Sequence, residues 1–121
     1  MEQALARGVG LRIVLGDRES HSDQEIDRQR HQLGRVVAAQ ASLLQWPTER
    51  RPRDEVGHAG LMHAKAAVAD SRIAFLSSAN LTEAALERNM ELGVLIRGGM
   101  LPASIDRLID ALKECGELQL G

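Results

Sequence analysis

His63 and Lys65 stand two residues apart in this 121-residue sequence, within the run HAKAAVAD. If this run is a β-strand, the imidazole and the ammonium group lie on one face of the sheet, because side chains alternate between faces. A histidine can attack phosphorus through one ring nitrogen, and a lysine can stabilise the charge that develops on phosphoryl oxygens. The pattern alone is short enough to occur by chance, and two solvated residues on a surface strand are the simpler interpretation.

Further polar residues follow where such a site would need them. Ser78 and Asn80 come at the end of the next predicted strand and can donate hydrogen bonds to the non-bridging oxygens of a phosphodiester. Glu91 begins a later strand, and its carboxylate can orient the second ring nitrogen of His63. Alternatives remain open, because Ser78 suits hydrogen bonding at a strand end, Asn80 suits a helix cap, and Glu91 suits a solvated strand position.

The joint spacing of these residues resembles the HKD motif of the phospholipase D superfamily. Six polar residues match its H-x-K-x(4)-D core, its G-S-x-N continuation and its downstream N-x-E, namely His63, Lys65, Asp70, Ser78, Asn80 and Glu91. Six matches in register over 29 residues are far more specific than an isolated HxK. Ser77 departs from the pattern, because the family usually has glycine there. The resemblance extends more weakly back to residue 1 and covers residues 1–98 in total.

The resemblance implies a phospholipase-D-like α/β fold and a phosphodiesterase mechanism. In that mechanism a histidine forms a covalent phosphohistidine, and water or an alcohol then releases the product without a metal or another cofactor. The family joins two such motifs in one active site. We therefore expect the second half-site to come from a homodimer or from a missing N-terminal part of a longer protein. A single motif behind a long capped helix also resembles the phospholipase-D-like component of bacterial anti-phage (DISARM) systems.

The six motif residues are therefore the expected catalytic half-site, with Lys65, Ser78 and Asn80 also binding substrate. Asp70 stands at a predicted tight turn, beyond the end of the strand that carries Lys65. A structural role in the turn is the simpler expectation for Asp70.

Any contact with a polyanion must come from a local cluster of positive charge. The net charge is −2 and the pI is about 6.1, whereas general nucleic-acid binders are usually basic. Aromatic residues make up only 2% of the chain, too few for a platform on which single-stranded bases stack. Arg51 and Arg53, in the loop before the motif, are candidate phosphate contacts, and His58 is a further candidate. A solvated loop is the simpler interpretation.

The elements that must position these residues alternate between helices and strands. Helices are expected at residues 1–7, from 23 to about 44, at 83–87 and at 102–114, and strands at 11–15, 61–69, 72–77 and 90–96. Residues 43–48 could add a short strand, which Pro47 would confine to a sheet edge. This order predicts a mixed α/β domain. Because no strand precedes the first helix, we expect a partial phospholipase-D-like domain over residues 1–121, with the core motif region at 61–97.

Composition places the chain in a reducing compartment. Cys115 is the single cysteine, which excludes an internal disulfide. No apolar run approaches the roughly 18 to 20 residues of a membrane span, and no signal peptide is recognisable, so we expect a cytoplasmic protein. The favoured hypothesis is a phosphodiesterase acting on nucleic acid rather than phospholipid. The alternative is a non-catalytic half-domain that acts as a module of a multi-protein defence or repair complex.

Overall fold

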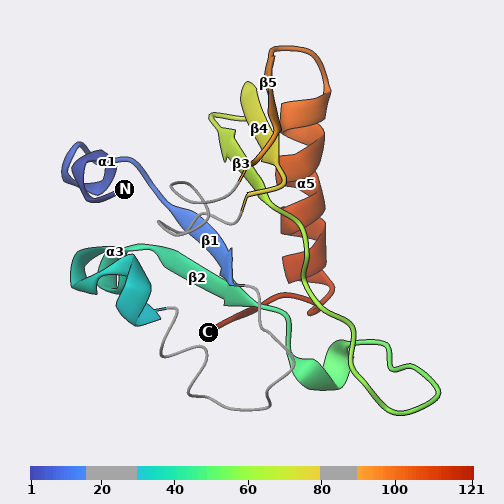
Figure 1. The fold of residues 1–121 in the computed structure, drawn as a ribbon. Helices are drawn as coiled ribbons and strands as arrows, with labels where there is room; N and C mark the ends of the chain where they lie inside the picture. Colours follow the sequence, from blue (N-terminus) through green and yellow to red (C-terminus); the bar gives the residue numbers. More distant parts are fainter. Residues whose placement is uncertain (16–29, 80–89) are drawn as a thin grey trace. The chain divides into compact units, whose positions relative to one another are not determined.

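The computed structural model describes residues 1–15, 30–79 and 90–121, which form two compact units (Figure 1). The first unit comprises Met1–Met62 and Cys115–Gly121, and the second comprises His63–Glu114. Each combines helical structure with a small sheet, which confirms the predicted mixed α/β fold. The predicted helix at 83–87, and the start of the second predicted helix, lie outside the described residues.

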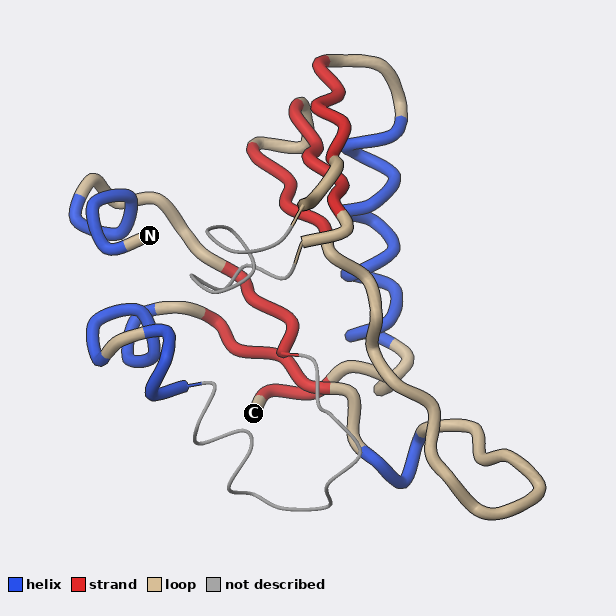
Figure 2. The backbone as a smooth tube through the Cα atoms, viewed as in Figure 1, coloured by secondary structure: helices blue, strands red, loops and turns tan. Residues whose placement is uncertain are grey.

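The first unit is built around a three-stranded sheet in the order β1-β2-β6 (Figure 2). Its strands are β1 (Arg12–Leu15), β2 (Ser42–Gln45) and β6 (Gln119–Leu120). β1 runs parallel to β2, and β6 runs antiparallel to it, so β2 is central. The strand expected near residues 43–48 was predicted to lie at a sheet edge, and this prediction is wrong. Pro47 lies beyond the end of β2, so the backbone N–H groups of β2 can pair with neighbouring strands.

The helices of the first unit are shorter than the sequence pattern predicts. α1 (Glu2–Ala6) ends just before Gly8, whose φ of +80° suits the expected helix stop. Gly34, with φ of +83°, immediately precedes α3 (Arg35–Gln40) and separates it from the helical residues before it. α3 also ends well before Leu44, so the prediction of one helix to about residue 44 is wrong. Leu44 pairs instead with Val14 across the sheet.

In the part of the second unit that the structure describes, three strands form an antiparallel meander with a helix beside it. The strands are β3 (Ala66–Ala69), β4 (Ile73–Ser77) and β5 (Gly93–Arg97), in the order β3-β4-β5, and the helix is α5 (Leu101–Glu114). α5 contacts all three strands (Figure 1). Val68, Ala74 and Ile96 are direct cross-strand neighbours, and Ala74 between them is fully buried, so they mark the covered face.

The strand that follows the first unit starts later than predicted. A strand over 61–69 was expected, but β3 begins at Ala66. Its partner β4 ends at Ser77, and the next residue, Ser78, pairs with Leu92 on the other side. Residues 61–65 therefore have little of β4 left to pair with. Among the described residues, the hydrogen bond from Ser77 N–H to the carbonyl of Lys65 is the one that continues the ladder.

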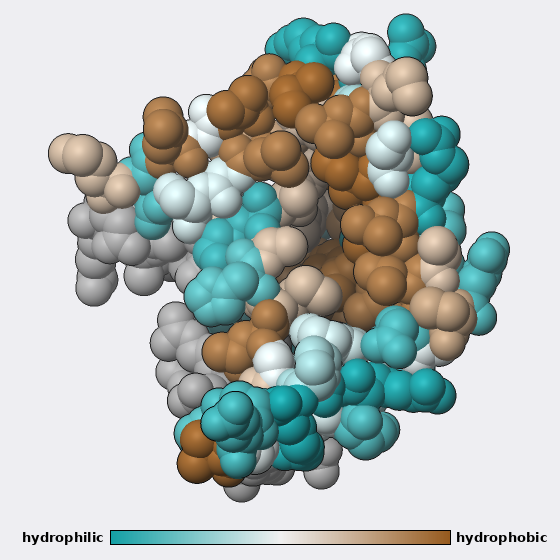
Figure 3. All heavy atoms as spheres, turned by 90° about the vertical axis from the view of Figure 1, so that its right-hand side faces the viewer, coloured by the Kyte–Doolittle hydropathy of each residue, from teal (hydrophilic) through white to brown (hydrophobic). Residues whose placement is uncertain are grey.

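Apolar side chains are divided between a small core and the surface. The first unit buries Leu15, Val37, Leu43, Leu44 and Leu118. On the second unit, Met90, Leu92, Val94, Leu95 and Met100 remain more than half exposed. Figure 3 shows brown apolar surface beside teal polar surface on the face that it presents. Among the helices of the described residues, none has the length and apolar character that crossing a membrane requires.

Leu44 offers a test of the central position of β2. Its side chain is fully buried, so Leu44→Ala should lower the free energy of unfolding by about 2–5 kcal/mol. Leu120, its partner on β6, is 67% exposed, and Leu120→Ala should cost no more than about 0.5 kcal/mol. Urea denaturation of both variants measures the difference. Equal midpoints for the two variants would contradict the position assigned to β2.

Candidate active site

The register of β3, β4 and β5 brings three motif positions to one end of the sheet. Ser77 N–H donates to the carbonyl of Lys65 at 3.1 Å, which places Lys65 beside the end of β4. Ser78 N–H donates to the carbonyl of Leu92 at 3.0 Å, which places the residue after Glu91 on the other side of β4. Neighbouring strands lie about 4.7–4.9 Å apart, so these backbone positions span about 10 Å.

Ser78 and Glu91 form a side-chain pair at this end of the sheet. The Ser78 hydroxyl donates to the Glu91 carboxylate at 2.5 Å, and it accepts a hydrogen bond from the Leu92 N–H at 3.1 Å. Because a serine hydroxyl has one hydrogen, the donor that the sequence assigned to substrate is engaged with Glu91. In this geometry Ser78 positions the carboxylate. The predicted orientation of His63 by Glu91 stays a prediction.

His63 and Lys65 are joined by a contact that the sequence did not predict. The Lys65 ammonium donates to the backbone carbonyl of His63 at 2.8 Å. This bond ties the lysine side chain to the backbone two residues earlier in the chain. An ammonium has three hydrogens, so two donors of the half-buried Lys65 remain for a phosphoryl oxygen. The imidazole of His63 is exposed, as an attacking group that must reach a substrate has to be.

Asp70 is not brought to this group. It lies in the turn between β3 and β4 with φ of +52°, and Ser71 beside it has φ of +51°. Positive φ at two successive residues is what tight hairpin turns of the mirror-image type require, and aspartate tolerates it better than most residues. The turn closes the end of the hairpin opposite to Lys65, with all of β3 between them. The contacts described therefore give Asp70 a role in the turn.

Two further expectations concern Asn80 and metal ions. Asn80, the remaining motif residue, lies outside the described residues. Over residues 1–15, 30–79 and 90–121, no three His, Cys, Asp or Glu side chains come together as metal ligands would.

The two candidate phosphate contacts in the loop differ in their surroundings. Arg51 is buried, and its guanidinium donates to the carbonyl of Trp46 at 2.9 Å from Nε and 2.5 Å from Nη2. It also lies 5.6 Å from the centroid of the Trp46 ring, within the range of a cation–π contact. The Trp46 indole in turn donates to Glu117 at 3.0 Å. Arg51 thus holds the loop to its unit, whereas Arg53 is exposed.

Sequence reasoning missed Asp54, which organises the loop over residues 53–58. Its carboxylate accepts hydrogen bonds from the N–H groups of Val56 at 3.0 Å and His58 at 2.8 Å. Its second oxygen lies 3.0 Å from Nδ1 of His58. The backbone N–H of His58, followed by its imidazole, holds the pKa of the Asp54 carboxyl below its ordinary value of 3.8. The signal in the sequence was an Asp and a His four residues apart beside a glycine.

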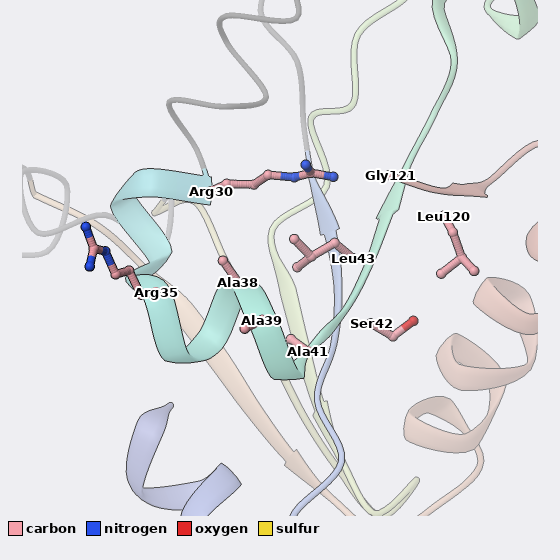
Figure 4. Close-up of a pocket in the computed structure, with 9 residues that line it drawn as sticks. All are labelled: Arg30, Arg35, Ala38, Ala39, Ala41, Ser42, Leu43, Leu120 and Gly121. Atoms are coloured by element: carbon pink, nitrogen blue, oxygen red, sulfur yellow. The ribbon is translucent and has the colours of Figure 1, made fainter.

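A hollow in the first unit is lined by residues that do not belong to the motif. It has a volume of about 620 Å³ and lies against α3, β2 and β6 (Figure 4). Arg30 and Arg35 both line it, but Figure 4 shows Arg30 reaching toward Leu43 while Arg35 points the other way. The two guanidinium groups therefore do not converge on one ligand, and the hollow offers a poorer candidate site than the motif.

Comparison with known proteins shows the family to which the chain belongs. The sequence profile of a family described as "Cardiolipin synthase, PLD-like domain" matches residues 1–113. The chain belongs to the phospholipase-D-like (PLD-like) family. The PLD-like chain is also similar in structure to NucT from Helicobacter pylori, with a TM-score of 0.70 and 19% identity over 93% of this chain and 67% of NucT. No curated protein matches the PLD-like chain significantly.

The family assignment confirms the resemblance to the phospholipase D superfamily that the motif predicted. At 19% identity, the likeness to NucT supports the PLD-like fold and nothing beyond it. The resemblance to the DISARM component stays a prediction.

The position of Asp70 leads to a test of its role. Asp70→Asn keeps a side chain that tolerates positive φ and removes only the charge. The variant should therefore fold as the parent does, and its rate of phosphodiester hydrolysis should stay within about twofold of the parent's. Lys65→Met, at the other end of the hairpin, should abolish most of the activity. Hydrolysis of bis-(p-nitrophenyl) phosphate measures both variants. A loss in Asp70→Asn as large as that in Lys65→Met would show that the aspartate charge takes part in the chemistry.

The lowered pKa of Asp54 predicts how the loop responds to acid. A carboxyl group with a depressed pKa in the folded state stabilises that state above its unfolded pKa, and this contribution is lost as the pH falls through the folded pKa. The amide resonances of Val56 and His58 should therefore shift together with one midpoint below pH 3.8. A two-dimensional NMR titration measures the midpoint. Asp54→Asn should remove this common shift, and its persistence would contradict the assignment.

Proposed function

We propose that this PLD-like chain supplies one half-site of a phosphodiesterase, with His63 as the nucleophile. One observation carries the proposal. Lys65, the Ser78–Glu91 pair and the exposed His63 belong to the same end of the second unit, through backbone pairing of Lys65 with Ser77 and of Ser78 with Leu92. The reaction needs a nucleophile, a cation for the phosphoryl oxygens and a carboxylate held in place by a hydrogen bond.

The proposed reaction proceeds in two displacements. A ring nitrogen of His63 attacks phosphorus, the N–P bond forms, and the bond to the leaving oxygen breaks as that oxygen takes a proton from an acid. Water then attacks the phosphorus of the phosphohistidine and gives a proton to the group that protonated the leaving oxygen; the O–P bond forms, the N–P bond breaks, and the product leaves as a phosphomonoester. Lys65 donates to the phosphoryl oxygens in both steps through the two hydrogens that His63 does not engage.

The acid for the leaving oxygen is assigned to a second half-site. The family places two motifs in one active site, and the chain carries one copy of the motif. Exposed apolar side chains around β5, among them Leu92, Val94 and Leu95, support the idea that this unit packs against another surface. A second copy of the chain, or another segment of a longer protein, would provide both the cover and the second histidine.

A nucleic acid is the proposed substrate class, with phospholipid as the rival. The family description names cardiolipin synthase, and this name is the argument for a phospholipid substrate. The described loop around Arg53 and His58 presents polar donors that suit a phosphate backbone. Cleavage of single-stranded DNA but not of phosphatidylglycerol vesicles is the expected outcome.

His63 is the residue whose replacement tests the proposal. His63→Ala removes the attacking nitrogen, so hydrolysis of bis-(p-nitrophenyl) phosphate should fall at least about 100-fold. His31→Ala, at an exposed histidine of the first unit, is the matched control and should keep the parent rate. A His63→Ala variant as active as the parent would end the proposal.

Two further measurements separate the chemistry from its rivals. EDTA should leave the rate unchanged, because the proposed steps use no metal ion. The mass of the protein in solution should show a dimer if a second copy completes the site. A monomer without hydrolytic activity would favour the non-catalytic half-domain.

A further inference from the structure

The loop over residues 53–58 is a small preformed structure within the first unit. Asp54 N–H donates to the carbonyl of His58 at 3.0 Å, and Gly57 N–H donates to the carbonyl of Asp54 at 3.0 Å. Arg53 forms an isolated bridge with Ala59, which closes the base. With the three hydrogen bonds to the Asp54 carboxylate, these contacts fix the backbone on which Arg53 and His58 are mounted.

One ring nitrogen of His58 contacts Asp54, and most of its side chain is exposed to solvent. Asp54 Oδ2 lies 3.0 Å from Nδ1, while 69% of the imidazole side chain is exposed. With the hydrogen of Nδ1 directed to the carboxylate, the ring is fixed in orientation and Nε2 is the atom left to meet a ligand. Once the ring is protonated, Nε2–H is a donor suited to a phosphate oxygen.

The side chain of Arg53 is fixed by a hydrogen bond within the same loop as His58. One nitrogen of its guanidinium donates to the carbonyl of Gly57 at 2.7 Å, which ties the side chain across the loop next to His58. A guanidinium has five hydrogens, so donors remain for a phosphate after this bond is made. Because both side chains are already fixed, little rotamer entropy is lost when they bind.

We propose that this loop is a phosphate-backbone clamp, in which Arg53 and His58 contact a single-stranded nucleic acid and Asp54 positions His58. The proposal rests on the phosphodiesterase function proposed above and names the substrate contact that lies outside the HKD motif. His58 precedes His63 by only five residues in the sequence.

Charge near the loop favours a nucleic-acid strand over a membrane surface. Binding to anionic lipid headgroups typically uses clusters of about four to eight basic residues. Here Arg51 is buried against Trp46, and Glu55 adds an exposed negative charge. The loop carries one arginine and two carboxylates, Asp54 and Glu55, so its two fixed donors suit a few localised phosphates and give a diffuse anionic surface little to bind.

The binding test uses His63→Ala as the background, so that DNA is not cleaved. Fluorescence anisotropy with a labelled 12-nucleotide single strand gives the Kd. Arg53→Gln and His58→Gln should each raise the Kd roughly three- to tenfold. Matched controls are Arg107→Gln, an exposed arginine that donates to Ser104, and His31→Gln, and neither should change the Kd by more than about twofold.

Salt dependence and a double-mutant cycle sharpen the test. Loss of one phosphate contact should reduce the slope of log K against log salt by about 0.7 in Arg53→Gln. Asp54→Asn should weaken binding by the same factor as His58→Gln, and should add nothing in the His58→Gln background. A merely structural role for Asp54 would make the two effects add.

Several outcomes would overturn the clamp. One is that Arg53→Gln and His58→Gln leave the Kd for DNA and its salt dependence unchanged. Another is that these variants lose binding to phosphatidylglycerol vesicles but keep their binding to DNA. Thermal melting of each variant checks that the fold is kept. Failure of the proposed function can be told apart from failure of the clamp. If the function fails, the parent protein does not hydrolyse bis-(p-nitrophenyl) phosphate. If the clamp fails, the loop variants bind DNA as tightly as the parent does.

Discussion

The candidate site depends on the antiparallel register of β3, β4 and β5. The tight turn at Asp70 and Ser71 fixes how β3 meets β4, and a slip of one residue would turn Lys65 to the opposite face. On the other side, a side-chain carbon at Gly93 would lie 2.7 Å from the ring of Phe75. Only glycine lets the ring lie over β5 in this register. Both constraints are steric, and together they align the strand ends where the motif residues sit.

At those strand ends, side chains take over where backbone pairing stops. The Ser78 hydroxyl accepts from the Leu92 N–H and donates to Glu91, so one oxygen both extends the β4–β5 ladder and holds a carboxylate. Lys65 ties back to the carbonyl of His63 and keeps two hydrogens for substrate. In the proposed half-site, Lys65, Ser78 and Glu91 are thus held in place before substrate arrives, which would reduce the cost of reorganisation when charge develops on the phosphoryl oxygens.

Local patterns in the sequence were enough for much of the fold. Period and stop signals predicted α1 with its end at Gly8, the strands near residues 11–15 and 72–77, and α5. The strand expected at 90–96, which Glu91 was to begin, starts only at Gly93 in β5. The turn at Asp70 and Ser71 was also predictable, because few residues tolerate positive φ. The spacing of six polar residues identified the family, since the motif is carried by sequence positions that need no knowledge of contacts.

Only the tertiary structure decided what those residues touch. Leu44 has the spacing of a helical face, yet it is the buried centre of a sheet, because pairing with β1 and β6 outweighs its local pattern. Arg51 was a candidate substrate contact, but the carbonyl and ring of Trp46 engage its guanidinium. Ser78 meets Glu91 thirteen residues away. The sequence by itself determined the types and spacing of the reactive groups, whereas their partners depended on pairing between distant segments, which no local pattern encodes.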